Sequence, residues 1–409
     1  MFLSRHVSKK MAKIRQWSGY NLRRGHFVDE IRDIFQDSNL NFLIGSGLSS
    51  PFLRTLGNIE VLLTDLADAS CPEDEKKIIR CSLYKQYFDG VIVRNPDILA
   101  LAEDALTVLN NYKTFLKTIN SILLSRKSTI LGKEANLFTT NLDVFIEKSI
   151  EDLGLECNDG FNGRFLPSFN LTNFKKSHFK RSLHYDNKSE LPVFNLLKLH
   201  GSLTWKLRTA DTIVFSSDLK QVSEIGACVC SPSMLVDVSG TSRLDALLSA
   251  ARGRRADPAL DKFMSAYDKL LIVNPTKEKF KQSLLNQTYY ELLRIYSNEL
   301  EKENTTLFVM GFSFGDQHIR DVTLRAANSN PTLMIYVVAH STQAQKEIED
   351  RLGIDHLKND NVRTISPPTK DGKDSFAYDL ETINREIFSK QFANEITDNP
   401  TSPTAEVPA

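Results

Sequence analysis

Apolar residues along this chain gather into short runs, and most of these runs end in a loop of glycine or polar residues. Four runs precede such a loop: LNFLI before Gly45, EANLFT before Thr140, VFNLLKL before His200 and TTLFVM before Gly311. Two further runs, at 269–274 and 332–339, have the same character. Apolar runs of about five to seven residues without polar alternation are typical of strands covered on both faces. The pattern predicts an α/β fold around a parallel sheet.

Helical periodicity marks two other segments. Residues 277–303 form the clearest helix, and with the runs at 269–274 and 306–310 they predict a strand, helix, strand unit with a parallel crossover. Within 60–130, a segment too long for one crossover helix, apolar residues recur at steps of three and four: Leu109, Tyr112, Leu116, Ile119 and Leu123. We interpret 60–130 as a helical insertion beside the sheet, serving as a cap over the site or an oligomer contact.

These patterns divide the chain into a discontinuous α/β domain, an insertion and a tail. The α/β domain is predicted to span 1–59 plus 131–390, with the helical insertion at 60–130 between its two parts. Residues 391–409 contain three prolines and almost nothing to bury, so a disordered tail is predicted there. A chain of 409 residues is long enough to bury a substantial core.

Composition narrows the function classes. Lys plus Arg and Asp plus Glu both number 51, so the formal net charge is zero and no overall basic field favours direct nucleic-acid binding. A local basic patch is still compatible with that balance. No apolar run has the length of a signal peptide or a membrane span, and the five cysteines form no zinc ribbon or disulfide pattern. We expect a cytoplasmic protein without a membrane segment.

The first loop, Gly45-Ser46-Gly47-Leu48-Ser49, has the composition of a phosphate-binding turn. Two glycines one residue apart permit a tight turn and let backbone N–H groups approach a ligand closely. The third position of a dinucleotide fingerprint is Ser50 here, and no acidic strand end follows about 20 residues later. An ordinary glycine turn between strand and helix explains the pattern equally well.

Polar side chains that can do chemistry follow the second and third strands. Thr140, Asn141 and Asp143 lie where a strand gives way to a helix. Asp143 there is typical of a helix cap, an interpretation that leaves Asn141 for another role. His200 ends the third strand with Gly201 behind it, and a histidine there can serve as a general base or be a structural residue with satisfied hydrogen bonds.

The fourth loop repeats the glycine pattern of the first. Gly311, Ser313, Phe314 and Gly315 precede a helix that Asp316 is predicted to cap, and this loop can hold another part of the same ligand. In doubly wound sheets, ligands bind outside the carboxyl ends of the strands, near the point where strand order reverses. All four loops lie at such ends, so we predict that they share one ligand.

Taken together in this order, the loops resemble the sirtuin superfamily, which binds NAD in a Rossmann-like fold. G-x-G-x-S matches Gly45 to Ser49, T-x-N-x-D matches Thr139 to Asp143, and H-G matches His200 and Gly201. The match covers the sheet-forming half to two-thirds of the chain. It implies a Rossmann-like doubly wound parallel sheet with helical insertions and an NAD-binding site.

Two departures from the deacylases shift the expected activity. The four-cysteine zinc module of that group is missing, since 210–265 contains only Cys228 and Cys230, and no zinc is expected. The fourth loop, GFSFGDQHI, is similar to that of the sirtuin-like NADases of bacterial antiviral defence, and the whole chain looks like the partner protein of a HerA-type ATPase. The resemblance therefore implies NAD+ hydrolysis by a homo-oligomer gated by assembly or by that ATPase.

The resemblance also assigns roles to residues. Asn141 and His200 are the expected catalytic residues, and Asp143 helps to position the nicotinamide end of NAD+ or the loop. The expected NAD-contacting set is Gly45, Ser46, Gly47, Ser49, Thr140, Asp143, Gly311, Ser313 and Phe314. Two alternatives stay open, namely an NAD or ADP-ribose sensor without turnover, and a protein deacylase or ADP-ribosyltransferase.

Overall fold

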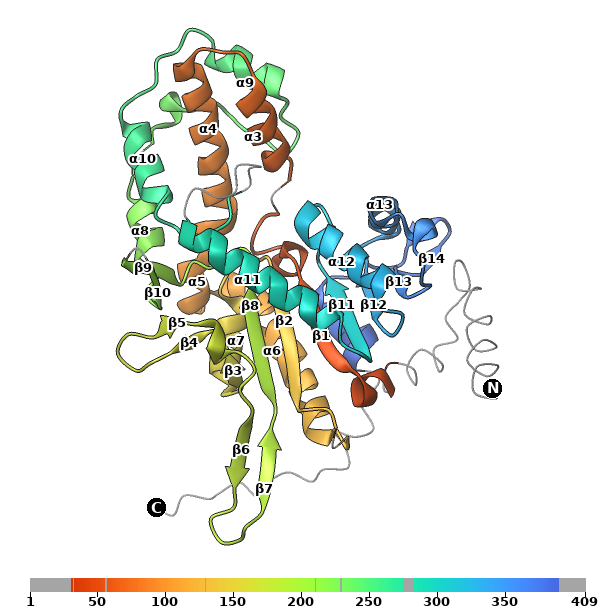
Figure 1. Cartoon of the computed structure of the whole chain (residues 1–409). Helices are drawn as coiled ribbons and strands as arrows, with labels where there is room; N and C mark the ends of the chain where they lie inside the picture. The colour runs from red at the N-terminus through yellow and green to blue at the C-terminus, as the bar shows by residue number, and fades with distance from the viewer. Residues whose placement is uncertain are drawn as a thin grey trace.

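A parallel sheet of seven strands forms the centre of the protein (Figure 1), seen here in a computed structural model. The structure describes residues 31–389 except 32, 56, 129, 210, 229 and 275–282. The strand order is β13-β12-β11-β1-β2-β8-β3, and every neighbouring pair is parallel. The strands are Asn39–Ile44 (β1), Glu134–Thr139 (β2), Glu156–Asn158 (β3), Val193–Lys198 (β8), Thr305–Met310 (β11), Met334–Val338 (β12) and Val362–Ile365 (β13). The α/β, Rossmann-like doubly wound fold is confirmed.

The strand order reverses at the centre of this sheet. From β1 the chain places β2, β8 and β3 on one side, and later returns to place β11, β12 and β13 on the other. The carboxyl ends of β1 and β11 are therefore the switch point, where open α/β sheets bind their ligands. The loops that begin at Gly45 and Gly311 both start there.

Helices cover both faces of the sheet. Phe42 and Ile44 of β1 pack in the same apolar cluster as α6 (Glu103–Ser125) and α7 (Phe145–Leu153). Leu43, on the other face of β1, packs with α11 (Ser283–Leu300), α12 (Gln317–Ser329) and α13 (Thr342–Leu352). Because successive strand residues face opposite layers, both faces need apolar side chains, which explains the uninterrupted apolar runs.

A helical lobe stands at one end of the sheet (Figure 1). Its helices are α3 (Ile59–Asp68), α4 (Glu73–Tyr87), α8 (Lys220–Gly226), α9 (Leu244–Ala251) and α10 (Ala259–Tyr267), with α5 (Asn95–Leu99) leading back to α6. Ring contacts join the two halves of the lobe, with Tyr84 4.9 Å from Tyr267 and Phe88 6.2 Å from Phe263 between ring centroids. The segment 60–130 thus contributes α3 and α4 to the lobe, whereas α6 covers the sheet.

The prediction of a strand at 269–274 is wrong. Within that segment, only Ile272 forms a bridge, and it pairs antiparallel with Gly201 rather than joining the sheet. Leu270 and Leu271 are buried against the two apolar clusters, so their burial produced an apolar run without a strand. The predicted parallel crossover therefore does not form, although α11 leads directly into β11. Part of the predicted helix, 277–282, and the predicted tail, 391–409, lie outside the described residues.

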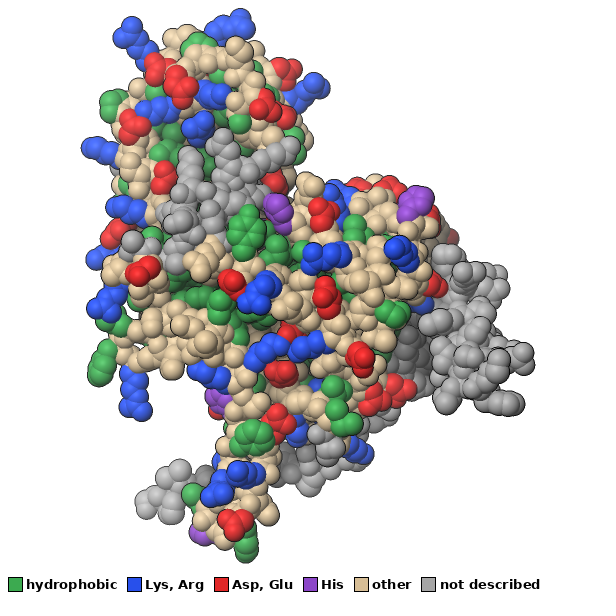
Figure 2. Space-filling model, viewed as in Figure 1, with side chains coloured by type: hydrophobic (Ala, Val, Ile, Leu, Met, Phe, Trp, Pro, Cys, Tyr) green, Lys and Arg blue, Asp and Glu red, His purple; other side chains and the backbone are tan. Residues whose placement is uncertain are grey.

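The part of the chain between β3 and α8 also forms a four-stranded sheet and a two-stranded hairpin. A four-stranded sheet contains Phe161–Asn162 (β4), Ser168–Phe169 (β5), Thr212–Phe215 (β10) and Trp205–Thr209 (β9). His178–Arg181 (β6) and Lys188–Leu191 (β7) form a hairpin that projects from the body (Figures 1 and 2). Near the carboxyl terminus lie β14 (Thr369–Lys370), β15 (Lys373–Asp374) and α14 (Leu380–Ile383). Among the described residues, no helix combines the length and apolar character needed to cross a membrane.

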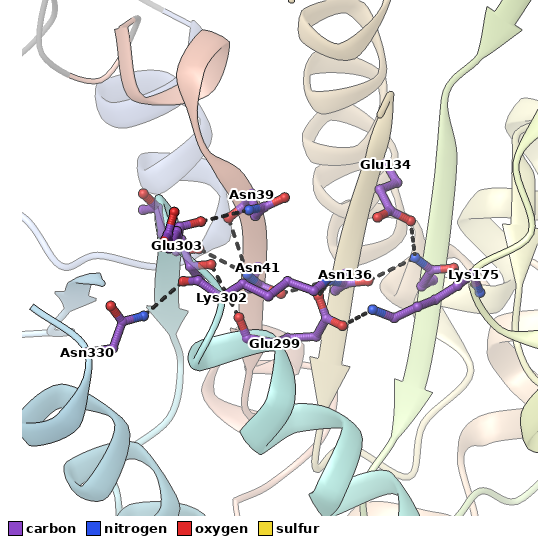
Figure 3. A network of polar contacts seen from close by, with 12 residues as sticks. Asn39, Asn41, Glu134, Asn136, Lys175, Glu299, Lys302, Glu303 and Asn330 are labelled. Atoms are coloured by element: carbon purple, nitrogen blue, oxygen red, sulfur yellow. Dashed lines mark hydrogen bonds and ion pairs between the residues drawn. The ribbon is translucent and has the colours of Figure 1, made fainter. Parts of the chain in front are cut away.

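A row of buried asparagines crosses four strands of the central sheet. Asn158, Asn195, Asn136 and Asn41 occupy paired register positions on β3, β8, β2 and β1. Each side chain donates to the next, with Nδ2 to Oδ1 distances of 2.8 to 2.9 Å. Asn136 Nδ2 also donates to Glu299 of α11 at 3.2 Å (Figure 3). A one-residue slip would break this row, so it specifies the register that aligns the strand ends.

Replacing Asn136 by leucine is expected to lower the free energy of unfolding by about 2–4 kcal/mol. The change leaves buried Asn41 Oδ1 without its donor, removes one of the two acceptors of Asn195 Nδ2 and removes a donor from Glu299. Chemical denaturation measures the loss. The control is Asn187→Leu, at an exposed hairpin position, and a loss no larger than that of the control would contradict this role for the row.

Candidate functional site

The four predicted loops leave the sheet at the same level. The register pairs the last residues of the four adjacent strands in one row: Met310 of β11, Ile44 of β1, Thr139 of β2 and Lys198 of β8. Asn141 and His200 each lie two residues beyond this row, on loops from adjacent strands. Neighbouring strands are about 5 Å apart, so the sheet brings both predicted catalytic residues to one edge.

The glycines of the first and fourth loops pack against each other. A Cβ at Gly45 would overlap the carbonyl oxygen of Gly311, and a Cβ at Gly47 would lie 3.0 Å from Gly311 Cα. Gly47 N donates to Gly311 O at 3.0 Å, and Gly311 itself has φ +63°. The close approach that these glycines permit is therefore made by backbone at the switch point. Phosphate binding by the two loops stays a prediction.

Asn141 presents a buried acceptor of known orientation. Its Nδ2 donates to Gly45 O at 3.2 Å and lies 3.4 Å from Ser49 Oγ, while its backbone N donates to Thr139 Oγ1. A flipped amide would place its oxygen against the Gly45 carbonyl, so the orientation follows from the contacts. Only 4% of the residue is exposed, and Oδ1 has no hydrogen-bond donor among the described residues. Oδ1 is therefore a buried acceptor whose capacity is unused among the described residues.

The Ser49 hydroxyl joins three elements. It donates to Asp143 Oδ2 at 2.7 Å and lies 3.1 Å from the hydroxyl of Tyr112 on α6. Because its one proton goes to Asp143, the Tyr112 hydroxyl is the donor in the second contact. Sequence reasoning placed Tyr112 only in the buried stripe of its helix. The hydroxyl of a tyrosine in an otherwise aliphatic stripe was the signal, since buried tyrosines usually find a polar partner.

Asp143 is buried and is hydrogen-bonded to Ser49 of the first loop and to Lys198 at the end of β8. Its Oδ1 accepts from Phe145 N at 3.3 Å at the start of α7, in keeping with the capping interpretation, while Oδ2 accepts from Ser49. Burial raises the pKa of Asp143 above its ordinary value, and the ammonium of Lys198 opposes that shift. Lys198 Nζ donates to the Asp143 carbonyl at 2.5 Å and lies 3.0 Å from Glu147 Oε1. A lysine inside an apolar strand was the overlooked signal for this contact.

His200 is held by its backbone and faces an acid from the fourth loop. Its carbonyl accepts from Val273 N at 2.8 Å, and Gly201 behind it has φ +78°. The imidazole Nε2 lies 3.2 Å from Asp316 Oδ2, a distance that fits an ion pair with the protonated ring, although the direction does not fit a hydrogen bond. Asp316 Oδ1 accepts from Ile319 N at 3.1 Å, which confirms the predicted cap of α12.

The other predicted ligand-binding residues take varied positions. Ser46 and Thr140 are half-buried, and Thr140 N donates to Ile44 O at 3.3 Å. Ser313 is exposed and its carbonyl accepts from Arg351 at 2.8 Å. Phe314 has φ +56°, and its ring is buried in the apolar cluster beside α12. Its side chain therefore anchors the loop in the core.

Contacts link the four loops into one ring at the sheet edge. The fourth loop packs on the first through Gly311 and Gly45, the first bonds the second through Ser49, and Lys198 at the end of β8 bonds the second. His200 closes the ring by facing Asp316 of the fourth loop. An amide acceptor, a carboxyl group and an imidazole thus lie on connected loops at one edge of the sheet.

A cavity of about 570 Å³ adjoins the first loop on the side of the helical lobe. Its lining residues include Phe52, Arg54, Lys85, Arg94 and Asp237, but neither Asn141 nor His200. Among the described residues, no group of three or more His, Cys, Asp or Glu is arranged to hold a metal ion. No protein-family model matches this chain, and no curated protein matches it in sequence.

Replacing Asp143 by asparagine is expected to raise the stability of the protein at pH values above the ordinary pKa of an aspartate carboxyl group. A raised folded-state pKa means that ionisation costs more in the folded chain, so stability is lost as the pH rises through that pKa. Asparagine avoids this cost, and we expect a thermal midpoint about 2 °C higher at pH 7.5, with the gain disappearing near pH 4. Asp186→Asn, in the exposed hairpin turn, is the control. A gain that is equal at both pH values would contradict the explanation.

Proposed function

We propose that this protein hydrolyses NAD+ at the bond between nicotinamide and ribose, giving nicotinamide and ADP-ribose. The observation that carries the proposal is the buried Asn141 Oδ1, fixed in orientation and without a donor among the described residues, at the same sheet edge as His200. The ordered resemblance of the four loops to sirtuin-like NADases supports the choice of NAD+ over other nucleotides.

The chemistry needs no oxidant or reductant. The C1′–N bond breaks, neutral nicotinamide leaves with the bonding electron pair, and positive charge develops on the sugar. The oxygen of water then bonds to C1′, and its proton passes to a base. Asn141 Oδ1 is suited to accept from a ribose hydroxyl or from the attacking water, and His200, beside Asp316, is suited to take the proton.

The remaining contacts divide the dinucleotide between the loops. The glycine loops at Gly45–Ser49 and 311–314 are proposed to hold the pyrophosphate and the adenosine through the Ser46 and Ser313 hydroxyls and through backbone N–H groups other than those of Gly45, Gly47 and Leu48, which donate to carbonyls of the protein. Asp143 is proposed to position the nicotinamide end. As an ionised carboxylate it would also favour the cationic nicotinamide ring of NAD+.

In the cell, we propose that the protein is an effector of antiviral defence that depletes NAD+ in the cytoplasm. An NADase that was always active would drain its host, so activity is expected to be gated by homo-oligomer assembly or by a HerA-type ATPase. The helical lobe is the proposed contact surface, because it brings parts of 60–130 and 205–265 together outside the sheet.

Nicotinamide release measures this function directly. The purified chain is incubated with NAD+, alone and with a HerA-type ATPase, and the products are separated by chromatography. We expect slow release alone and faster release with the partner. Tight NAD+ binding without release under either condition would replace the proposal by the sensor. Release that requires an added acylated peptide or protein acceptor would favour a deacylase or ADP-ribosyltransferase.

A further inference from the structure

A lysine is buried directly behind the loop that carries Asn141. Lys198 ends β8, only two residues before His200, and 4% of it is exposed. Burial of a lysine is costly unless it gains several partners. Neither the sheet nor the resemblance to sirtuins assigns this side chain a role. Its role is therefore inferred from the groups that its ammonium contacts.

The Lys198 ammonium makes two different contacts. It lies 3.0 Å from the carboxylate of Glu147 on α7, and it donates at 2.5 Å to the backbone carbonyl of Asp143. The first contact balances charge, whereas the second restrains backbone two residues beyond Asn141. On the opposite side, Asn141 Nδ2 is held by Gly45 O and Ser49 Oγ. The loop 141–143 is therefore clamped between the first strand's loop and Lys198.

The surrounding charges show why a cation is needed there. Two carboxyl groups, that of buried Asp143 and that of partly buried Glu147, share this one ammonium group, and the Ser49 hydroxyl also donates to Asp143 at 2.7 Å. Burial raises the pKa of both carboxyl groups, and Lys198 opposes the shift in each. An apolar residue at 198 would leave both carboxyl groups without a counter-ion, as well as freeing the Asp143 carbonyl.

We infer that Lys198 is a positioning residue, which holds the Asn141 acceptor at the reacting sugar by bonding the Asp143 carbonyl. The consequence for turnover rests on the proposed NAD+ hydrolysis. The consequence for the loop does not, since the restraint on 141–143 exists whatever the ligand is. Balancing Glu147 is a separate task, and the two tasks can be separated by mutation.

The experiment compares Lys198→Met with the double variant Lys198→Met/Glu147→Gln. The double variant removes both members of the Lys198–Glu147 ion pair, so its thermal midpoint is expected to recover part of what the single variant loses, while buried Asp143 still lacks its counter-ion. Turnover is not expected to recover: kcat stays at least about tenfold below that of the parent, with a smaller change in KM. Lys206→Met, at an exposed site on β9, is the control and is expected to match the parent.

Amide hydrogen exchange provides a readout that does not depend on activity. Peptides covering 139–146 are expected to exchange faster in the double variant than in the parent, while peptides from β12 stay unchanged. If the double variant regains parental turnover and parental exchange, Lys198 only balances Glu147 and the inference is overturned. If the parent releases no nicotinamide with its partner, the proposed function fails, and the exchange result alone decides the role of Lys198.

Discussion

Nicotinamide release by Asn141→Ala is expected to fall about a hundredfold to a thousandfold below that of the parent. The substitution removes the oriented Asn141 Oδ1 acceptor at the sheet edge, and comparable losses follow removal of a single preorganised polar group in other enzymes. The loss is expected mainly in kcat, because the glycine loops would still bind the dinucleotide. Single-turnover assays with saturating NAD+ measure it.

Two controls separate chemistry from folding in that experiment. Asn187→Ala changes an exposed asparagine in the hairpin turn and is expected to leave turnover unchanged. The thermal midpoint of Asn141→Ala is measured in parallel, since Gly45 O and Ser49 Oγ each lose a partner. Parental turnover by folded Asn141→Ala would remove this residue from the mechanism.

His200→Ala is expected to lower turnover to a similar extent, about a hundredfold to a thousandfold. The imidazole is the proposed base, and Asp316 Oδ2, 3.2 Å from its Nε2, can pair with the ring once it has taken the proton. Asp316→Asn is therefore expected to give a smaller loss, about tenfold, because it removes the carboxylate that faces the imidazole. Turnover measured at saturating NAD+ tests both variants.

The matched control for that series is His184→Ala, at an exposed position in the β6–β7 hairpin. It is expected to behave as the parent. Equal losses in His184→Ala and His200→Ala would mean that the assay responds to general damage. Parental turnover by Asp316→Asn would show that Asp316 does not act on His200.

Much of the fold was predictable because a strand that is buried on both faces has an uninterrupted run of apolar residues in the sequence. The strands are the runs before Gly45, Thr140, His200 and Gly311, whose side chains pack against helices on both faces of the sheet. The same reasoning failed at 269–274, where burial came from a loop packed beside Gly201. An apolar run reports burial, and only its pairing partners decide whether it forms a strand.

The paired glycines illustrate how a correct signal can have another cause. Close backbone approach at Gly45 and Gly47 was predicted for a ligand, and the structure has the Gly311 backbone there. Gly311 lies more than 260 residues further along the chain, and no local pattern specifies that contact. Only the fold, which places both loops at the switch point, shows that Gly311 is the contact partner of Gly45 and Gly47.

The catalytic candidates were predictable from their positions at strand ends, whereas their supporting residues were not. Asn141 and His200 follow buried strands, which sequence shows. Tyr112, Glu147 and Lys198 act through contacts between helices and strands that are distant in sequence. Each looked like an ordinary helix or strand residue, and only tertiary packing brings its polar atoms to the loop.

A structure of His200→Gln with NAD+ bound tests the central claim most directly. That variant keeps Asn141 and its contacts while slowing turnover. We predict that the nicotinamide ribose lies between Asn141 Oδ1 and residue 200, with the pyrophosphate along Gly45–Ser49. A dinucleotide bound instead in the cavity beside Arg54, or with its sugar away from Asn141, would contradict the account.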